Sequence, residues 1–463
     1  MRKLRVHLVI VVAVAIAIGS PGGCVLPTIA SAAPDDSQPV AIALGDSVVA
    51  LNGPWRFHTG DDLHWAEPLF DDSSWESVDL TPPPGARDSD VGLTGYVPGW
   101  GARGHAGHGG YGWYRIRVAV TAPATADLAL AGPPAVDSAY QLYLNGQLLG
   151  GIGDFTQAQP RLYSIQPRKY VLPEQLTRAG TLVIAFRVWM GPWGAANPVA
   201  GGIHIAPSLG ELAGIEARYR SQWLETFKGY IVEVVEAFLF VLLAGIALSL
   251  AVFDGTDRAY RWLATALVLT AMYRANQALY FWTQCETTGD YELLIRVLII
   301  PLAMGAYMRA WYAWFRLETP SWPRRVVPVL TMTYVIAEFF CRSWFYGLFP
   351  SGITIALHYL IICVRLLFMI LLALITYHGI RRQRPAGWYA LPAVLSIAVA
   401  LFAQELSAIH VPGIWFPFGT GVSRTQYAYA VFDVSLACAL LQRLRSYARR
   451  SCAPALGGVI ETH

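Results

Sequence analysis

Ionisable side chains interrupt the long apolar segments that fill the second half of this chain. They comprise five acids, four arginines and one histidine, so nearly every charge can be paired. A charged group in the hydrocarbon of a bilayer is costly, and such residues usually face other helices or a wet cavity. We expect them to form a polar network that transmits movement to the helices, holds the helices together, or passes an ion or proton. The predicted members are Glu233, Glu236, Arg274, Arg296, Glu338, Arg342, His358, Arg365, Glu405 and Asp433.

A second group of candidate residues precedes the apolar segments. Trp100 and Trp193 occur in loops rich in glycine and proline, and Trp189 lies close to the second of these loops. Aromatic rings offer flat apolar surfaces on which sugar rings can stack. Carboxylate and amide groups, here Asp137 and Asn145, can bind hydroxyl groups. We therefore predict a ligand site formed by these five residues, although tryptophans in such a region also serve as core residues.

Metal and catalytic chemistry have little support. His105 and His108 share a glycine-rich loop, but no third ligand is close in the sequence. His358 and His378 lie at opposite ends of one apolar segment, and no Ser/His/Asp set converges there. The sequence therefore predicts no metal, no other cofactor and no enzymatic activity.

The region before the apolar segments is predicted to be a β-sandwich. Residues 113–120 alternate between apolar and polar types, as a half-buried strand does, and residues 181–189 are predicted to be a further clear strand. Residues 140–144 alternate too and run into Asn145-Gly146, a strong signal for a tight hairpin. Many short strands at such spacing are typical of a sandwich or jelly roll. The absence of cysteine between Ala33 and Phe227 means that disulfides do not hold this region together.

Four segments in this region carry a family resemblance. Residues 51–57, 70–75, 112–115 and 136–146 resemble, in order, the sugar-binding jelly roll of family 2 glycoside hydrolases. The resemblance implies a galactose-binding-like fold. In those hydrolases a catalytic barrel with paired glutamates follows the domain, whereas apolar segments follow it here. The resemblance therefore does not imply glycosidase activity.

Seven apolar segments are each near the roughly 20 residues needed to cross a bilayer as a helix. Arginine-rich connections alternate with connections poor in basic residues, which predicts that the arginine-rich side is cytoplasmic. A basic start, an apolar stretch and Ala30-Ser31-Ala32 predict a signal peptide at 1–32, with an uncleaved anchor or lipidation at Cys24 as alternatives. The predicted spans are 227–253, 259–282, 291–315, 326–349, 353–378, 388–410 and 426–444.

The expected order is thus a signal peptide, an extracytoplasmic jelly roll at 33–210, a linker at 211–226, an all-α seven-helix bundle at 227–444 and a basic cytoplasmic tail at 445–463. This order resembles the bacterial seven-transmembrane receptors with diverse intracellular signalling modules. Family members usually end in a cytoplasmic kinase, cyclase, phosphatase or DNA-binding module. The tail here is too short to fold as such a module.

The sequence therefore predicts a sensory receptor of the bacterial cytoplasmic membrane. Its exported jelly roll would bind a carbohydrate-like ligand and signal through the helices to a separate cytoplasmic partner. The predicted partners are this ligand, the lipid bilayer and the signalling protein, and nucleic acid is not among them. The alternatives are a transporter or permease, and a truncated receptor that has lost its kinase or phosphatase module.

Overall fold

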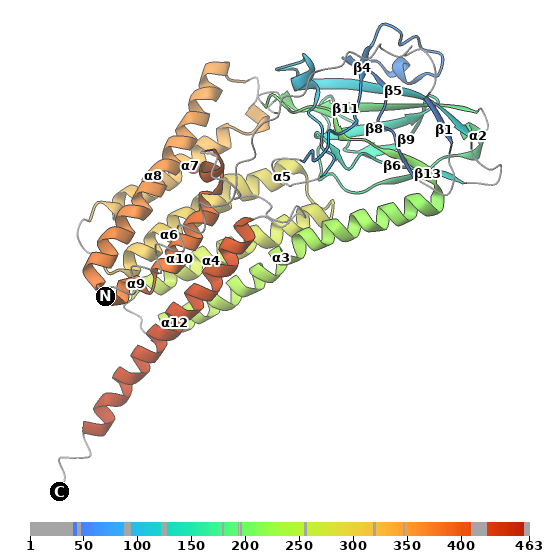
Figure 1. The fold of residues 1–463 in the computed structure, drawn as a ribbon. Helices are drawn as coiled ribbons and strands as arrows, with labels where there is room; N and C mark the ends of the chain where they lie inside the picture. Colours follow the sequence, from blue (N-terminus) through green and yellow to red (C-terminus); the bar gives the residue numbers. More distant parts are fainter. Residues whose placement is uncertain are drawn as a thin grey trace. The chain divides into compact units, whose positions relative to one another are not determined.

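The computed structural model describes residues 40–43, 48–87, 94–121, 127–177, 180–192, 194, 197–253, 257–317, 321–345, 348–408 and 424–457. A β-rich region comes first and a helical region follows it (Figure 1). The predicted signal peptide and Trp193 lie outside the described residues.

Two main antiparallel sheets form the β region. The larger sheet has the strand order β4-β3-β5-β11-β8-β9, and β1 adds to β5 in parallel. Its strands are β1 (Val40–Ala43), β3 (Trp55–Thr59), β4 (Glu76–Val78), β5 (Gly110–Thr121), β8 (Ala139–Leu144), β9 (Gln147–Ile152) and β11 (Thr181–Met190). The smaller sheet has the order β10-β6-β13-β2. It consists of β2 (Val49–Ala50), β6 (Leu128–Ala131), β10 (Lys169–Val171) and β13 (Ser208–Glu211), while β7 (Ala135–Val136) pairs separately with β12 (Ile203–Ile205).

Strand alternation explains how the sheets pack. Along β5, Tyr114, Ile116 and Val118 point into the main apolar core, which also contains residues of the smaller sheet. Trp113 and Arg115 point to the opposite face, because successive side chains of a strand alternate. The segment before β4 covers that face, and Arg115 donates to Asp72 there at 2.8 Å. The predicted β-sandwich is therefore present.

The predicted hairpin is also present. Strands β8 and β9 pair with Leu144 opposite Gln147, so Asn145 and Gly146 form a two-residue turn. Both turn residues have positive φ, at 49° and 85°, which a type I′ turn requires. The Asn145 side chain accepts a hydrogen bond from the Val183 amide at 2.7 Å. Asn145 therefore serves the turn and its link to β11.

Helices occupy the second half of the chain and enclose a second apolar core. They are α3 (Leu212–Phe253), α4 (Arg258–Trp282), α5 (Thr288–Glu292), the π-helix η4 (Leu293–Ile299), α6 (Ile300–Trp314), α7 (Pro323–Phe340), α8 (Ser351–Gln383), α9 (Pro385–Trp388), α10 (Leu391–Leu401), α11 (Ala403–Ala408) and α12 (Arg424–Gly457).

Three stretches of the described helices are long and apolar enough to cross a membrane, against the seven predicted. These stretches are Leu212–Phe253, Thr288–Trp314 and Gly352–Gln383. Helices also lie at the other four predicted positions, but charged residues or breaks in the helix distinguish these four from the three stretches above. Arg274 interrupts α4, for example, and the predicted sixth span is divided into α9, α10 and α11.

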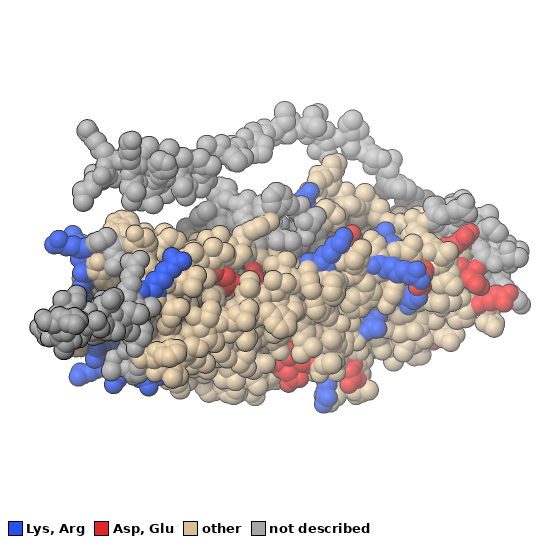
Figure 2. Space-filling model, turned by 90° about the horizontal axis from the view of Figure 1, so that it is seen from below, with Lys and Arg blue, Asp and Glu red and all other residues tan. Residues whose placement is uncertain are grey.

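The arginine-rich connections gather at one end of the helical region. Arg443 of α12 is 3.3 Å from Asp257, which precedes α4, and donates at 2.7 Å to the Trp314 carbonyl at the end of α6. Gln383 at the end of α8 donates to the same carbonyl at 3.0 Å. Figure 2 shows Lys and Arg side chains gathered at one end of the face in view and few charged side chains along the adjoining stretch.

Helix α3 joins the sandwich to the helical region without a break. Residues 211–226, predicted as a linker, are almost entirely the first part of this 42-residue helix. At 1.5 Å per residue it is about 63 Å long. Ile215 packs against Ala129 and Ala131 of β6, and Glu216 forms an ion pair with Lys169 of β10. The first two turns of α3 therefore pack on the sandwich, and later parts of the helix line the cavity and pack among the helices.

Candidate functional site

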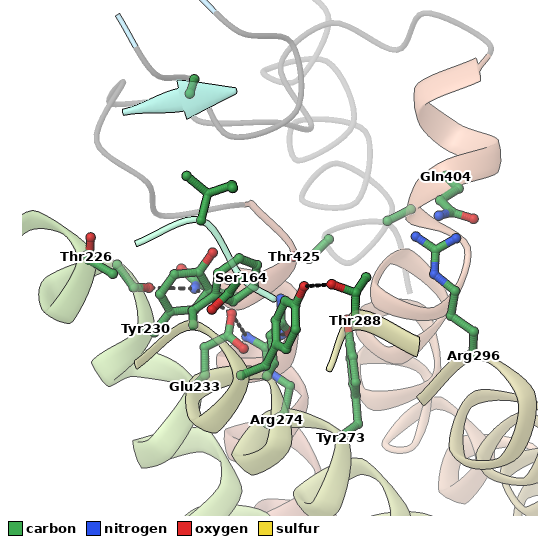
Figure 3. A pocket seen from close by; sticks show the side chains of 18 of the residues that line it. Ser164, Thr226, Tyr230, Glu233, Tyr273, Arg274, Thr288, Arg296, Gln404 and Thr425 are labelled. Atoms are coloured by element: carbon green, nitrogen blue, oxygen red, sulfur yellow. Dashed lines mark hydrogen bonds and ion pairs between the residues drawn. The ribbon is translucent and has the colours of Figure 1, made fainter. Parts of the chain in front are cut away.

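A cavity of about 1300 Å³ lies between the sandwich and the ends of the helices remote from Arg443. Its lining combines loops of the sandwich with residues of α3, α4, α6, α7, α8 and α12 (Figure 3). Typical small-molecule sites measure about 300–1,000 Å³. This cavity can therefore admit a ligand of several rings.

A loop of the sandwich fixes one wall of the cavity to the end of α4. Gln166 donates to the Thr283 carbonyl at 2.9 Å, and Arg168 donates to the Gln284 side chain at 2.6 Å. The Leu162 carbonyl accepts from the Thr288 amide at 2.8 Å. The sandwich and the helices thus hold each other through several direct hydrogen bonds.

Asp137 and His204 form the polar part of the sandwich wall. Nε2 of His204 lies 3.0 Å from Oδ2 of Asp137, and Nδ1 lies 2.9 Å from the Val97 carbonyl. A carbonyl only accepts, so Nδ1 carries a hydrogen. The Tyr96 ring stacks on the imidazole with 4.4 Å between the ring centroids. Burial favours a higher pKa for Asp137, but hydrogen bonds from His204 and from the Gly201 amide outweigh it and leave the pKa below its ordinary value.

One arginine bridges two glutamates on the helical wall. Arg274 of α4 lies 2.7 Å from Oε2 of Glu236 and 3.1 Å from Oε1 of Glu233, both on α3. Gln426 of α12 donates to Glu233 at 3.2 Å. Figure 3 shows Glu233 and Arg274 together below the sandwich loop. These contacts tie α3, α4 and α12 together at the cavity floor. The carboxylate of Asp433, also on α12, is buried and has no hydrogen-bond partner among the described residues.

Four more of the predicted network residues form two further groups. Arg342 lies 2.6 Å from Glu338 and 3.4 Å from Glu292. Arg365 of α8 donates to Glu405 of α11 at 2.8 Å and to the Tyr334 hydroxyl of α7 at 2.7 Å. The predicted network is therefore divided into three local clusters, which contain Glu233, Glu236 and Arg274, then Glu338 and Arg342, then Arg365 and Glu405.

Besides Asp433, two predicted network members lie outside these clusters. His358 is exposed on α8 and contacts the ring of its neighbour Tyr359, so the rotation of α8 turns it away from the clusters. Arg296 is also exposed, but it lines the cavity beside Gln404 (Figure 3). It makes no ion pair with any described residue.

The predicted ligand site is wrong for two of its three tryptophans. Trp100 is 1% exposed, its ring stacks on Phe57, and its indole nitrogen donates to the His108 carbonyl at 3.2 Å. Trp189 in β11 is 4% exposed. Both are core residues because the close packing of the sandwich covers their faces. Of the five predicted ligand residues, Asp137 lines the cavity, and Asn145 occupies the hairpin turn.

Tyrosines line the cavity instead of tryptophans, and they are not among the predicted ligand residues. Tyr96 belongs to the sandwich wall, and Tyr230, Tyr273 and Tyr280 belong to the helical wall. A signal was available, because Tyr230 and Glu233 are three residues apart on α3, and positions so spaced share a helical face. The described residues contain no group of three His, Cys, Asp or Glu side chains that could hold a metal ion.

Comparison with known proteins finds solved structures of glycosyl hydrolases that are similar to a limited part of this chain. The similar region is also a small part of each hydrolase. No family model and no curated protein matches the chain. A Bacteroides uniformis beta-glucuronidase is 20% identical with a TM-score of 0.24, over 35% of this chain and 17% of the enzyme. A family 2 glycosyl hydrolase from Bacteroides cellulosilyticus is 18% identical with a TM-score of 0.23, over 36% of this chain and 20% of the hydrolase. The chain thus spans a fifth or less of the length of these enzymes, and such scores assign it neither activity nor substrate.

Proposed function

We propose that this chain is a membrane sensory receptor whose ligand binds in the cavity between the sandwich and the helices. The observation that carries the proposal is the shared lining of this cavity. Asp137 and His204 come from the sandwich, while Tyr230, Arg274 and Gln426 come from three different helices. A ligand that touches both walls stabilises some arrangements of the two regions over others, which is the requirement for a ligand-driven change.

The lining favours a carbohydrate-like ligand. Tyrosine rings on both walls offer apolar faces, and Asp137, Asn197 and Gln277 offer hydrogen-bonding groups for hydroxyls. The volume of about 1300 Å³ is sufficient for an oligosaccharide. A galactose-binding-like jelly roll is the fold that we propose for the sandwich, in keeping with its two-sheet core.

Helices α3 and α12 are the proposed route to the opposite end of the helical region. Helix α3 packs on the sandwich at Ile215 and contributes Glu233 to the cavity floor. Gln426 links that glutamate to α12, whose far end carries Arg443 and Arg445. A shift at the cavity floor would change the position of this basic end, where we propose that a separate cytoplasmic signalling protein docks.

The membrane arrangement in this proposal has seven spans, with the sandwich outside and the arginine-rich end in the cytoplasm. The clustering of Asp257, Trp314, Gln383 and Arg443 at one end supports the alternation that such an arrangement needs. A green fluorescent protein fused after His463 is expected to fluoresce, and an alkaline phosphatase at the same point is expected to be inactive. The reverse pattern would refute the orientation.

Ligand binding to the full chain in nanodiscs tests the central proposal. Calorimetry against an oligosaccharide panel is expected to give a hit that Tyr96→Leu and Tyr230→Leu each weaken by several-fold, because each removes a ring from one wall. Tyr377→Leu on the exposed face of α8 is the matched control, since Tyr377 does not line the cavity. Loss with Tyr96→Leu alone would show that the ligand does not bridge the walls. Binding of no saccharide would refute the ligand class.

A proton-coupled transporter is the second candidate, and the cavity floor favours it. Glu233, which lines the cavity, and Glu236, which does not, share the single positive charge of Arg274, and the Asp433 carboxylate is buried without a hydrogen-bond partner among the described residues. Buried carboxylates of this kind are common in proton relays. Saccharide uptake into proteoliposomes that is driven by a pH gradient and abolished by Asp433→Asn would favour transport over sensing.

A further inference from the structure

Arg296 lies at an irregular point of the helical wall. It belongs to the π-helix η4, in which the Ile300 amide bonds to the Ile295 carbonyl five residues earlier. An α-helix would place that bond four residues apart, so the extra residue widens the turn and shifts the side chains. Short π-helical segments within helices are frequent at functional sites. Figure 3 shows Arg296 and Gln404 on one side of the cavity, across from Glu233 and Arg274.

Arg296 forms no direct ion pair with a described residue, unlike most of the charged groups that line the cavity. Most described charged groups of the lining are in ion pairs, namely Asp137 with His204, Glu233 with Arg274, Glu338 with Arg342, and Arg365 with Glu405. Glu225 and Lys228 are opposite charges one helical turn apart on an exposed part of α3. Arg296 has no described acid within ion-pairing distance, because Glu292, one helical turn before it, pairs with Arg342 at 3.4 Å.

We infer that Arg296 binds an anionic group of the cavity's ligand and that this ligand is an acidic saccharide, one that bears a carboxylate. The inference rests on the proposed carbohydrate receptor and specifies its ligand. A guanidinium presents a planar set of donors that matches a carboxylate with two parallel hydrogen bonds. Gln404 lies beside it and can serve a neighbouring hydroxyl. The tyrosine rings of the two walls would then hold the sugar rings.

Trigalacturonate and its fully methyl-esterified form are a matched pair of probes, because they share the same sugar units and differ in charge. The full chain in nanodiscs is expected to bind the acid at least tenfold more tightly than the ester. Arg296→Gln is expected to weaken binding of the acid by about tenfold to a hundredfold, the range for a lost charge-assisted contact, and to leave binding of the ester unchanged. Arg296→Lys is expected to retain part of the preference for the acid.

Arg261→Gln is the control variant, because Arg261 is an exposed arginine of α4 that does not line the cavity. It is expected to bind both probes as the wild type does. Equal binding of acid and ester, or an unchanged preference in Arg296→Gln, would overturn the role of Arg296 while a saccharide receptor stands. If neither probe and no neutral oligosaccharide binds the wild type, the proposed function falls together with this inference.

A phospholipid headgroup also carries an anionic group that Arg296 could bind, and lipid analysis distinguishes the two sources. Native mass spectrometry of wild type and Arg296→Gln, purified identically, is expected to show the same bound phospholipid. A tightly bound anionic lipid that is present in the wild type, lost in Arg296→Gln and not displaced by trigalacturonate would assign the site to lipid and overturn the acidic saccharide.

Discussion

Replacing Arg274 with methionine is expected to destabilise the helical region strongly. Arg274 neutralises Glu233 and Glu236 at 3.1 and 2.7 Å, and all three side chains are almost completely buried. Methionine keeps much of the apolar length of the side chain but removes the positive charge. Two buried carboxylates then lose their counter-ion. Breaking a buried ion pair from one side costs about 3–5 kcal/mol, because an uncompensated charge remains in a poorly solvated site.

A second substitution tests whether the effect is electrostatic. Adding Glu236→Gln to Arg274→Met removes one of the two buried carboxylates that have lost their counter-ion. The double variant is expected to recover part of the lost free energy of unfolding. The single change Glu236→Gln leaves Arg274 paired with Glu233 and is expected to cost less than Arg274→Met. The coupling energy from this double-mutant cycle isolates the interaction from the lost packing.

Arg261→Met supplies the baseline for this series. Arg261 lies on the exposed face of the same helix, and surface substitutions usually change stability by less than about 0.5 kcal/mol. The free energy of unfolding can be measured by denaturant titration of the chain in mixed micelles, with folded yield as a second readout. An Arg274→Met variant as stable as Arg261→Met, or a double variant less stable than Arg274→Met, would refute the role given to the cluster.

Three further predictions concern single sites. Asp137→Asn should destabilise the sandwich at neutral pH, and the difference from wild type should vanish in acid. The pKa of Asp137 in the folded protein lies below its ordinary 3.8. The stabilisation by His204 is therefore present above pH 3.8 and is lost as the pH falls through the pKa of the folded state. A thermal melt series across this range checks it, and a constant difference would contradict it. Asp433→Asn should stabilise the chain or leave it unchanged, because the carboxylate has no partner to lose among the described residues; a marked loss of stability would reveal one. Gly201→Ala should cost more than about 2 kcal/mol, because φ is +101° and the added Cβ would lie 2.2 Å from Nε1 of Trp100; an unchanged melting temperature would contradict the packing.

Local patterns were enough to predict many elements of this chain. Alternation identified β5 and β8, a short apolar run identified β11, and Asn145-Gly146 identified the hairpin turn, because strand burial and turn geometry depend on adjacent residues. Runs of apolar residues located the helices for the same reason. They did not establish seven spans, since a span also depends on where charges and helix breaks fall, and three stretches meet the requirement.

The tertiary structure decided which residues form the site. The Trp100 ring is buried because Gly112 and Gly201 have no side chains to exclude it, and Gly201 is distant from Trp100 in the sequence. The pairing of the charged side chains on the helices depends on helix rotation, which turns His358 outward. The sequence by itself determined the β-then-α order and most of the polar residues that could act. The cavity and the exposure of Arg296 within it arise only when the sandwich and several helices meet, because contacts between residues more than a hundred positions apart create that space.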